Sequence, residues 1–291
     1  MAAACTGGLD LPLLFLVVLA VVQGITEFLP ISSSGHLELA WQAMRNGEVV
    51  LPPEGDRLVL FVAVHLGTLF AVLGYFWRDV LALIGGTLRL VTGRGGPAAY
   101  LALHIITATL PLVAFGLLLK DILVDLVYSP VIIAWTNIVF AVFLYLSDRL
   151  GMTLRRAEHL TIPSALVIGF AQVLSLIPGT SRSGVTMTAA RMLGFERLEA
   201  ARISLLMAIP AILGAAILQG IVIYERGDLS LGIDSAIAAV LAFAVALAAI
   251  AAMMAWLRRA SFTPFVVYRL LLGALLLWLI HKGVPIGDSP F

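Results

Sequence analysis

The stretch QGITEFLPISSSGH, residues 23–36, decides the fold because it places a helix break and several polar side chains within an apolar region. It follows an apolar run that begins near residue 11, and it carries Gln23, Glu27, three serines and His36. Pro30 has no backbone N–H to donate and disfavours a helix that continues through it. The stretch therefore predicts two short helices joined by a polar loop.

The composition of the whole chain is that of a membrane protein. Of its 291 residues, 61% are hydrophobic and 12% are charged, and the mean hydropathy is +1.07. Apolar runs that approach the length of a bilayer crossing cover residues 58–77, 98–119, 131–146, 203–224, 236–257 and 265–280. We therefore predict an all-α, polytopic integral membrane protein with about six full transmembrane helices, forming a single membrane domain over residues 1–291.

The few charges indicate how the chain lies in the membrane. Lys and Arg occupy short connections and form no basic block, and the net charge is +1, so we expect no nucleic-acid partner. One alternate set of connections holds eleven Lys and Arg residues and the other holds five, which places the first set in the cytoplasm. Arg155 and Arg191 both belong to the cytoplasmic set. The segment between them must therefore leave and return on one face.

A second polar loop lies in that segment: IPGTSRSG, residues 177–184, in which Pro178 and Gly179 break a helix. At an offset of about 149 residues, the longer stretch QVLSLIPGTSRSG, residues 172–184, matches QGITEFLPISSSG, residues 23–35, at four pairs, Gln23/Gln172, Ser32/Ser181, Ser34/Ser183 and Gly35/Gly184. The charge pattern inserts the two loops from opposite faces. We therefore predict an inverted-topology repeat, with repeat one at about 8–147 and repeat two at about 160–283. It contains two re-entrant helix–loop–helix pairs whose loops meet within the membrane.

The two loops combine groups suited to a charged ligand. Gln23 and Glu27 lie four residues apart, on one face of a helix, where they could share a cation or a proton. The Arg182 guanidinium matches phosphate and carboxylate oxygens, and a helix start attracts anions. Two simpler interpretations stay open: the serines only cap helix starts, or Arg182 only neutralises Glu27.

His36 introduces reactive chemistry, because a neutral imidazole can act as base, acid or nucleophile. It could activate the hydroxyl of Ser33 or Ser34, activate a water molecule, or attack directly. His65, in another apolar run, could line the same cavity, although a contact between helices is an equally good explanation.

Four strings, QGITEFLPISSSGH, FWRD, IPGTSRSGVT and AIPAILGA, resemble the undecaprenyl-diphosphate phosphatase, or bacitracin-resistance, family, and the similarity extends over almost the whole chain. The resemblance implies a bacterial inner-membrane enzyme that removes the terminal phosphate of a polyprenyl diphosphate and so regenerates the carrier lipid for cell-wall synthesis. It also implies an inverted repeat with two re-entrant pairs, a site open to the periplasmic side, and dependence on Mg2+ or Ca2+.

The resemblance assigns roles to residues of both loops. Glu27, Ser33, His36 and Arg182 are expected to be catalytic, and Glu27 with Gln23 to hold the metal. Gln23 stands where the family often has Glu, so the cation would rest mostly on Glu27. The expected substrate-binding residues are Ser32, Ser34, Gly35, Thr180, Ser181, Ser183 and Gly184.

Other functions and partners also follow from these patterns. Membrane lipid surrounds such a chain, and a homodimer is compatible with it. The alternative function is a secondary transporter or lipid flippase that binds an anionic headgroup without hydrolysis.

Overall fold

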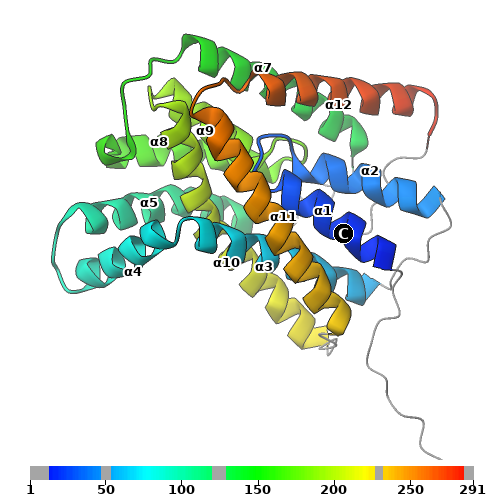
Figure 1. Ribbon diagram of the computed structural model, residues 1–291, viewed down its shortest axis with the longest axis horizontal. Helices are drawn as coiled ribbons and strands as arrows, with labels where there is room; N and C mark the ends of the chain where they lie inside the picture. Colours follow the sequence, from blue (N-terminus) through cyan, green and yellow to red (C-terminus); the bar gives the residue numbers. More distant parts are fainter. Residues whose placement is uncertain (1–12, 47–53, 120–128, 227–231, 285–291) are drawn as a thin grey trace, which may run out of the picture.

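The computed structural model describes residues 13–46, 54–119, 129–226 and 232–284, and every regular element within these ranges is a helix (Figure 1). Six of them are long and apolar enough to cross a membrane. These are α3 (Glu54–Tyr75), α5 (Pro97–Leu118), α7 (Pro130–Leu150), α10 (Arg197–Arg226), α11 (Ile233–Leu257) and α12 (Thr263–His281). The predicted all-α, polytopic membrane architecture is confirmed.

The remaining helices are shorter. The two predicted polar loops separate α1 (Leu13–Thr26) from α2 (Ser33–Asn46), and α8 (Ile162–Val173) with the 3-10 turn η2 (Leu174–Leu176) from α9 (Arg182–Met192). The helix α4 (Trp77–Val91) pairs with α5, and the turn η1 (Ala157–His159) precedes α8. Re-entry of the two loop-bearing pairs stays a prediction, as do the repeat boundaries; residues 8–12 of repeat one lie outside the described part.

The two loops share an unusual backbone conformation. Ser32 and Ser181 have φ of 71° and 68°, and they are the only non-glycine residues with positive φ in the described ranges. A side chain disfavours this left-handed region, at a cost on the order of 1–3 kcal/mol. The two serines are equivalent in the sequence alignment of the loops, so both copies turn by the same strained step. This similarity supports the predicted repeat.

Close helix contacts hold the first loop in place. The helix α11 packs against both α1 and α3. A Cβ added to Gly24 would lie 2.8 Å from the Cβ of Val245, and one added to Gly67 would lie 2.2 Å from the carbonyl oxygen of Ala239. Small residues at these crossings let the backbones approach closely, which fixes the end of α1 against its neighbours.

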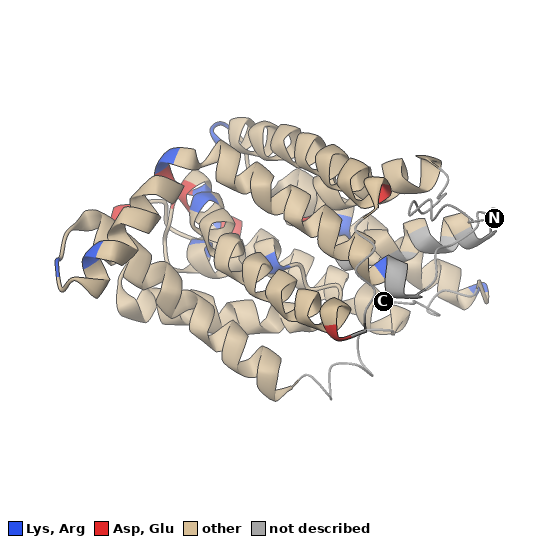
Figure 2. Ribbon diagram, turned by 90° about the horizontal axis from the view of Figure 1, so that it is seen from below, with Lys and Arg blue, Asp and Glu red and all other residues tan. Residues whose placement is uncertain are grey.

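An ion cluster formed by the buried Asp148 and Arg191 and the partly exposed Arg197 ties the later helices together. Asp148 Oδ1 lies 3.3 Å from Arg191 Nε and 2.6 Å from Arg197 Nε, and Asp148 Oδ2 accepts a hydrogen bond from the Phe262 amide at 3.1 Å. The Arg191 Nη atoms donate to the backbone carbonyls of Asp148, Gly151, Met152 and Phe195. The cluster joins α7, α9 and α10 with the residue that precedes α12. Figure 2 shows charged segments gathered toward the end of the molecule that includes the α4–α5 turn.

Candidate functional site

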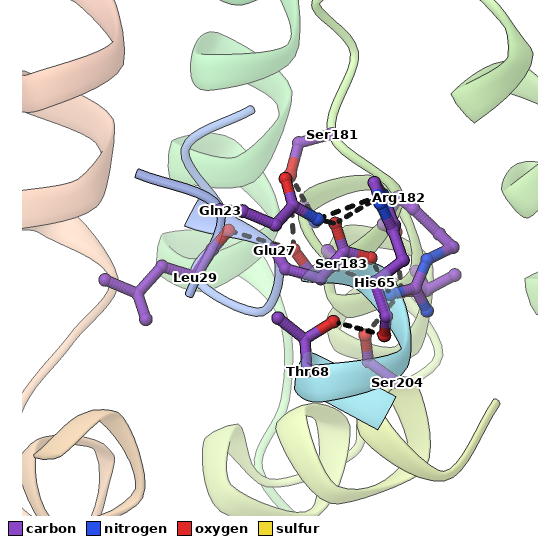
Figure 3. A network of polar contacts seen from close by, with 11 residues as sticks. Gln23, Glu27, Leu29, His65, Thr68, Ser181, Arg182, Ser183 and Ser204 are labelled. Atoms are coloured by element: carbon purple, nitrogen blue, oxygen red, sulfur yellow. Dashed lines mark hydrogen bonds and ion pairs between the residues drawn. The ribbon is translucent and has the colours of Figure 1, made fainter. Parts of the chain in front are cut away.

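The two polar loops meet. Arg182 Nη2 lies 3.1 Å from Glu27 Oε1, and Ser183 Oγ donates a hydrogen bond to the Leu29 carbonyl at 3.0 Å (Figure 3). The Glu27 and Arg182 side chains are 9% and 14% exposed, so the ion pair is largely shielded from solvent. A carboxylate buried to this extent requires a partner of opposite charge. Residues 155 positions apart in the chain thus form one polar centre.

Glu27 also has neighbours on its own side of the centre. Gln23, one helical turn earlier, donates through Nε2 to Glu27 Oε2 at 2.9 Å, and the same nitrogen lies 2.9 Å from His65 Nε2. His65 Nδ1 lies 2.8 Å from the Phe61 carbonyl oxygen, which can only accept, so Nδ1 carries the proton. His65 Nε2 is therefore the acceptor for Gln23. Figure 3 shows these side chains converging from α1, α3 and the start of α9.

The start of α9 is capped by one of the predicted serines. Ser181 Oγ accepts a hydrogen bond from the Gly184 amide at 3.2 Å, as a helix N-cap does. Capping therefore accounts for part of the role of Ser181, whereas Ser183 reaches across to the first loop. Arg182 Nη1 is buried and has no hydrogen-bond partner among the described residues. Part of its guanidinium is thus left for an anion.

Arg269 of α12 is a site residue that the sequence interpretation did not assign. Its side chain is fully buried, and Nη2 donates to the carbonyls of Gly179 and Thr180 at 3.1 and 3.0 Å. Its Nε and Nη1 are without partners in the part of the chain that the structure describes. A Cβ added to Gly184 would lie 2.7 Å from Nη1, so the arginine fits closely against the second loop. The available sequence signal was a permanent charge within an apolar span.

His36 lies in an adjoining group with Tyr268. Its Nδ1 donates to the Ser32 carbonyl at 2.6 Å, its Nε2 lies 2.6 Å from the Tyr268 hydroxyl, and the two rings stack with centroids 5.3 Å apart. Burial lowers the pKa of His36 below its ordinary value; the hydrogen bond to Ser32 raises it, and the charge of Arg269 lowers it again. The imidazole is therefore neutral at neutral pH, with Nε2 as its basic nitrogen.

The structure does not direct His36 toward Ser33, because both ring nitrogens are engaged elsewhere. Ser33 is the first residue of α2, and the side chain of Ser34 lies outside the described part. The pairing of Ser33 with His36 stays a prediction. Arg269 connects the two groups of the site, since it binds the second loop and directly follows Tyr268, whose hydroxyl contacts His36.

Two further predicted positions border the second loop and α2. Thr180 is fully buried, and its hydroxyl has no partner within the described ranges. A Cβ added to Gly35 would lie 3.3 Å from Asn137 Nδ2, so the start of α2 packs closely on α7. Thr180 thus offers another unused donor near Arg269, whereas Gly35 has a packing role.

A divalent cation would find few protein ligands here. No group of three His, Cys, Asp or Glu residues in the described segments could hold a metal. However, Gln23 Oε1 is buried and has no partner in those segments, beside the carboxylate of Glu27. Mg2+ is commonly held by one or two carboxylates together with substrate phosphates and water. The residues fit a cation that a bound phosphate helps to hold.

Comparison with known proteins gives a consistent family. The model described as "Bacitracin resistance protein BacA" matches residues 16–275, which include all of the site residues. Undecaprenyl-diphosphatase 1 of Rhodospirillum rubrum is 51% identical over 96% of this chain and 98% of its own. The undecaprenyl-diphosphatases of Jannaschia sp. and Roseobacter denitrificans are 47% and 46% identical, over 90% and 91% of this chain and 96% and 97% of theirs.

Proposed function

The chain belongs to the bacitracin resistance protein BacA family, and from this premise we propose how its two loops act on a polyprenyl diphosphate. The protein is a membrane phosphatase that converts undecaprenyl diphosphate to undecaprenyl phosphate and inorganic phosphate. The observation that carries the proposal is the buried contact of Glu27 with Arg182, beside arginine N–H groups that no described residue uses. Such a centre suits a ligand with several negative charges.

Binding of the diphosphate headgroup falls to the second loop. Arg182 Nη1, the two unused nitrogens of Arg269 and the Thr180 hydroxyl supply donors, and the start of α9 adds backbone amides. Phosphoryl transfer depends mainly on positioning and on stabilising charge at the transferred and leaving oxygens. Fixed donors in a site shielded from water achieve this without rearranging in the transition state. The two arginines therefore both bind the substrate and lower the barrier.

The proposed nucleophile is the Ser33 hydroxyl, with His36 Nε2 as its base. The Ser33 oxygen forms a bond to the terminal phosphorus, the bond from that phosphorus to the bridging oxygen breaks, and undecaprenyl phosphate leaves with the electron pair. The hydroxyl proton passes to His36. Water then hydrolyses the phosphoserine. The two alternatives are attack by a water molecule activated at His36 Nε2 and attack by His36 Nε2 itself. In each of the three routes, His36 Nε2 must first leave the Tyr268 hydroxyl.

Rapid acid quenching of a reaction with substrate labelled in the terminal phosphate separates these routes. Phosphoserine survives acid, so we expect labelled protein after the acid quench of the wild type. The Ser33→Ala variant should give no labelled protein. Phosphohistidine is lost in acid but survives base. Label retained only after a base quench would therefore favour His36, and no labelled protein in either quench would favour direct attack by water.

A divalent cation, Mg2+ or Ca2+, is proposed to bind between Glu27, Gln23 Oε1 and the headgroup. When bound, it neutralises charge on the diphosphate. Gln23 Nε2 is held by its hydrogen bond to Glu27, whereas Gln23 Oε1 has no hydrogen-bond partner among the described residues and is left for the cation. EDTA should stop phosphate release and added Mg2+ should restore it. Full activity in EDTA would remove the cation from the proposal.

The bacterial inner membrane and a site open to the periplasm are proposed from the family to which the chain belongs. The excess of eleven Lys and Arg over five supports only the orientation of the helices. Hydrolysis of substrate added outside intact spheroplasts tests this orientation. The homodimer also stays a proposal, and light scattering of the detergent-solubilised protein measures it.

Phosphate release by the purified protein is the central test. Undecaprenyl diphosphate in detergent should yield one inorganic phosphate per substrate molecule. A transporter or flippase would bind the headgroup and release none. That alternative is not favoured, because the relatives that cover nearly the whole chain are named diphosphatases.

A further inference from the structure

An apolar groove of about 650 Å³ borders the site between the end of α1, the helix α11 and the start of α12. Ile25 and Leu29 line it where the first loop begins, and Trp256 and Phe265 line it at the other end. Leu29 belongs to the site itself, because its carbonyl accepts the hydrogen bond from Ser183. The groove therefore starts at the polar centre.

A neighbouring hollow extends the same surface toward His36. It shares Trp256 and Pro264 with the groove and includes Tyr268, whose hydroxyl contacts His36 Nε2. Both groups of the site, around Glu27 and around His36, are thus continuous with one apolar surface. A molecule with a charged head in the site would have its hydrophobic part beside this groove.

The lining explains why the groove is open. Between its ends, α11 contributes three alanines, at positions 248, 249 and 252, whose small side chains leave room along the helix. Ile25 and Trp256 are 38% and 47% exposed, so the groove opens to the surroundings of the protein. From Val245 to Trp256 the helix rises about 16 Å. A hydrocarbon chain could enter from the side and lie along this length.

We propose that this groove binds the head-proximal part of the polyprenyl tail of the substrate. The inference rests on the proposed function: if the site binds the diphosphate of the substrate, the polyprenyl tail of that substrate is the hydrocarbon chain that starts beside Leu29. Lipid is as apolar as the groove, so the tail gains van der Waals packing against the alanines and Trp256 rather than a hydrophobic driving force, and this packing holds the headgroup in register. Because the tail is remote from the reacting atoms, its contacts stabilise the bound substrate and the transition state alike and act on KM.

The chain contains a matched control surface. A second apolar groove, of about 360 Å³, lies between α4, α5 and α10, and no site residue lines it. Thr87 is an exposed small residue in that groove, as Ala252 is in the first. A phenylalanine at either position fills an apolar groove on a helix surface, but only one of the two grooves borders the site.

The test compares Ala252→Phe with Thr87→Phe on two substrates, undecaprenyl diphosphate and dimethylallyl diphosphate, whose single prenyl unit ends short of Ala252. We expect Ala252→Phe to raise KM for the long substrate about tenfold, which is a loss of about 1.4 kcal/mol, with kcat unchanged. Its kinetics on the short substrate should equal those of the wild type. Thr87→Phe should change neither. Should Ala252→Phe unfold, Ala249→Leu fills the same groove with a smaller side chain.

The outcomes distinguish a failure of the proposed phosphatase activity from a failure of the proposed tail-binding groove. If the wild type releases no phosphate from undecaprenyl diphosphate, the proposed function fails first. If the wild type is active but the folded groove variants keep the wild-type KM, the groove holds only bulk lipid and the inference is overturned. An equal rise in KM for both substrates would also overturn it, because a disturbance of the headgroup site would then explain the change.

Discussion

The Glu27–Arg182 pair and the Asp148–Arg191 pair are both buried ion pairs, with closest distances of 3.1 and 3.3 Å, but their remaining hydrogen-bond groups differ. Both Asp148 oxygens have partners, and both Arg191 Nη atoms donate to carbonyls. Arg191 Nε makes no hydrogen bond with a described residue, but it lies 3.3 Å from its counter-ion, Asp148 Oδ1. In the loop site, Arg182 Nη1 and two nitrogens of Arg269 have no partner within the described ranges. An ion cluster that satisfies itself stabilises the fold, whereas one with unused donors is built to receive a ligand.

The largest expected effect tests the open site. Arg182→Ala should lower kcat/KM about a thousandfold, or about 4 kcal/mol in transition-state stabilisation, because it removes a charged donor to the transferred phosphate. The melting temperature should also fall, because Glu27 is left buried without its counter-ion, so turnover is compared per folded molecule. Phosphate release and thermal unfolding in detergent measure the two effects. A folded Arg182→Ala protein with near-normal turnover would show that the Glu27–Arg182 pair, like the Asp148 cluster, only stabilises the fold.

The next effect tests the closed cluster. Asp148→Ala leaves the fully buried Arg191 without its counter-ion, so the free energy of unfolding should fall by about 3 kcal/mol. Turnover per folded molecule should persist, because Asp148, in α7, contacts α9, α10 and the residue before α12 rather than substrate. Thermal unfolding and phosphate release at low temperature check both parts. Loss of turnover without loss of stability would contradict this assignment.

A smaller effect is expected from displacing Arg269 without changing its charge. The Cβ in Gly184→Ala would lie 2.7 Å from Arg269 Nη1, so the guanidinium must move and kcat/KM should fall about thirtyfold, or about 2 kcal/mol. Gly86→Ala is the control, because its Cβ would lie 2.1 Å from the Ala98 carbonyl oxygen, in the α4–α5 contact. That variant should lose stability and keep its kcat. Equal kinetic losses in both variants would argue against a role for Arg269.

The smallest effect concerns the partner of His36. Tyr268→Phe removes the hydroxyl at His36 Nε2 and keeps the stacked ring. Because Nε2 must leave this hydroxyl to act as base, kcat should change only about threefold, as expected for one neutral hydrogen bond of about 0.6 kcal/mol. Steady-state phosphate release measures it. A loss of a hundredfold or more would instead make Tyr268 a direct participant in the reaction.

The sequence predicted the helices better than their contacts. The run predicted at 236–257 is found as α11, Ile233–Leu257, because bilayer thickness imposes a length that apolarity reveals. The meeting of Glu27 with Arg182 was also expected, since two matching loops at broken helices suggested one site. Both interpretations rest on local patterns in the sequence.

Arg269, His65 and Asp148 could not be placed in the same way. Arg269 and Gly179 are 90 positions apart, and their contact depends on how α12 packs beside α7 and the second loop. His65 is a polar residue in an apolar helix, and only the packing of α3 turns it toward Gln23. Asp148 precedes Arg149 near a helix end and resembles an ordinary charged connection. Helix packing depends on side-chain shape, which hydrophobic periodicity does not encode.

The contact of Glu27 with Arg182 has a thermodynamic consequence. If a bound phosphate drew the guanidinium away from Glu27, one carboxylate oxygen would be released and would be available to hold the proposed cation. Uptake of the anion and uptake of the cation are therefore linked, and each should increase the affinity for the other by the same factor. Magnesium should bind weakly to the substrate-free protein and tightly in the presence of a nonhydrolysable diphosphate.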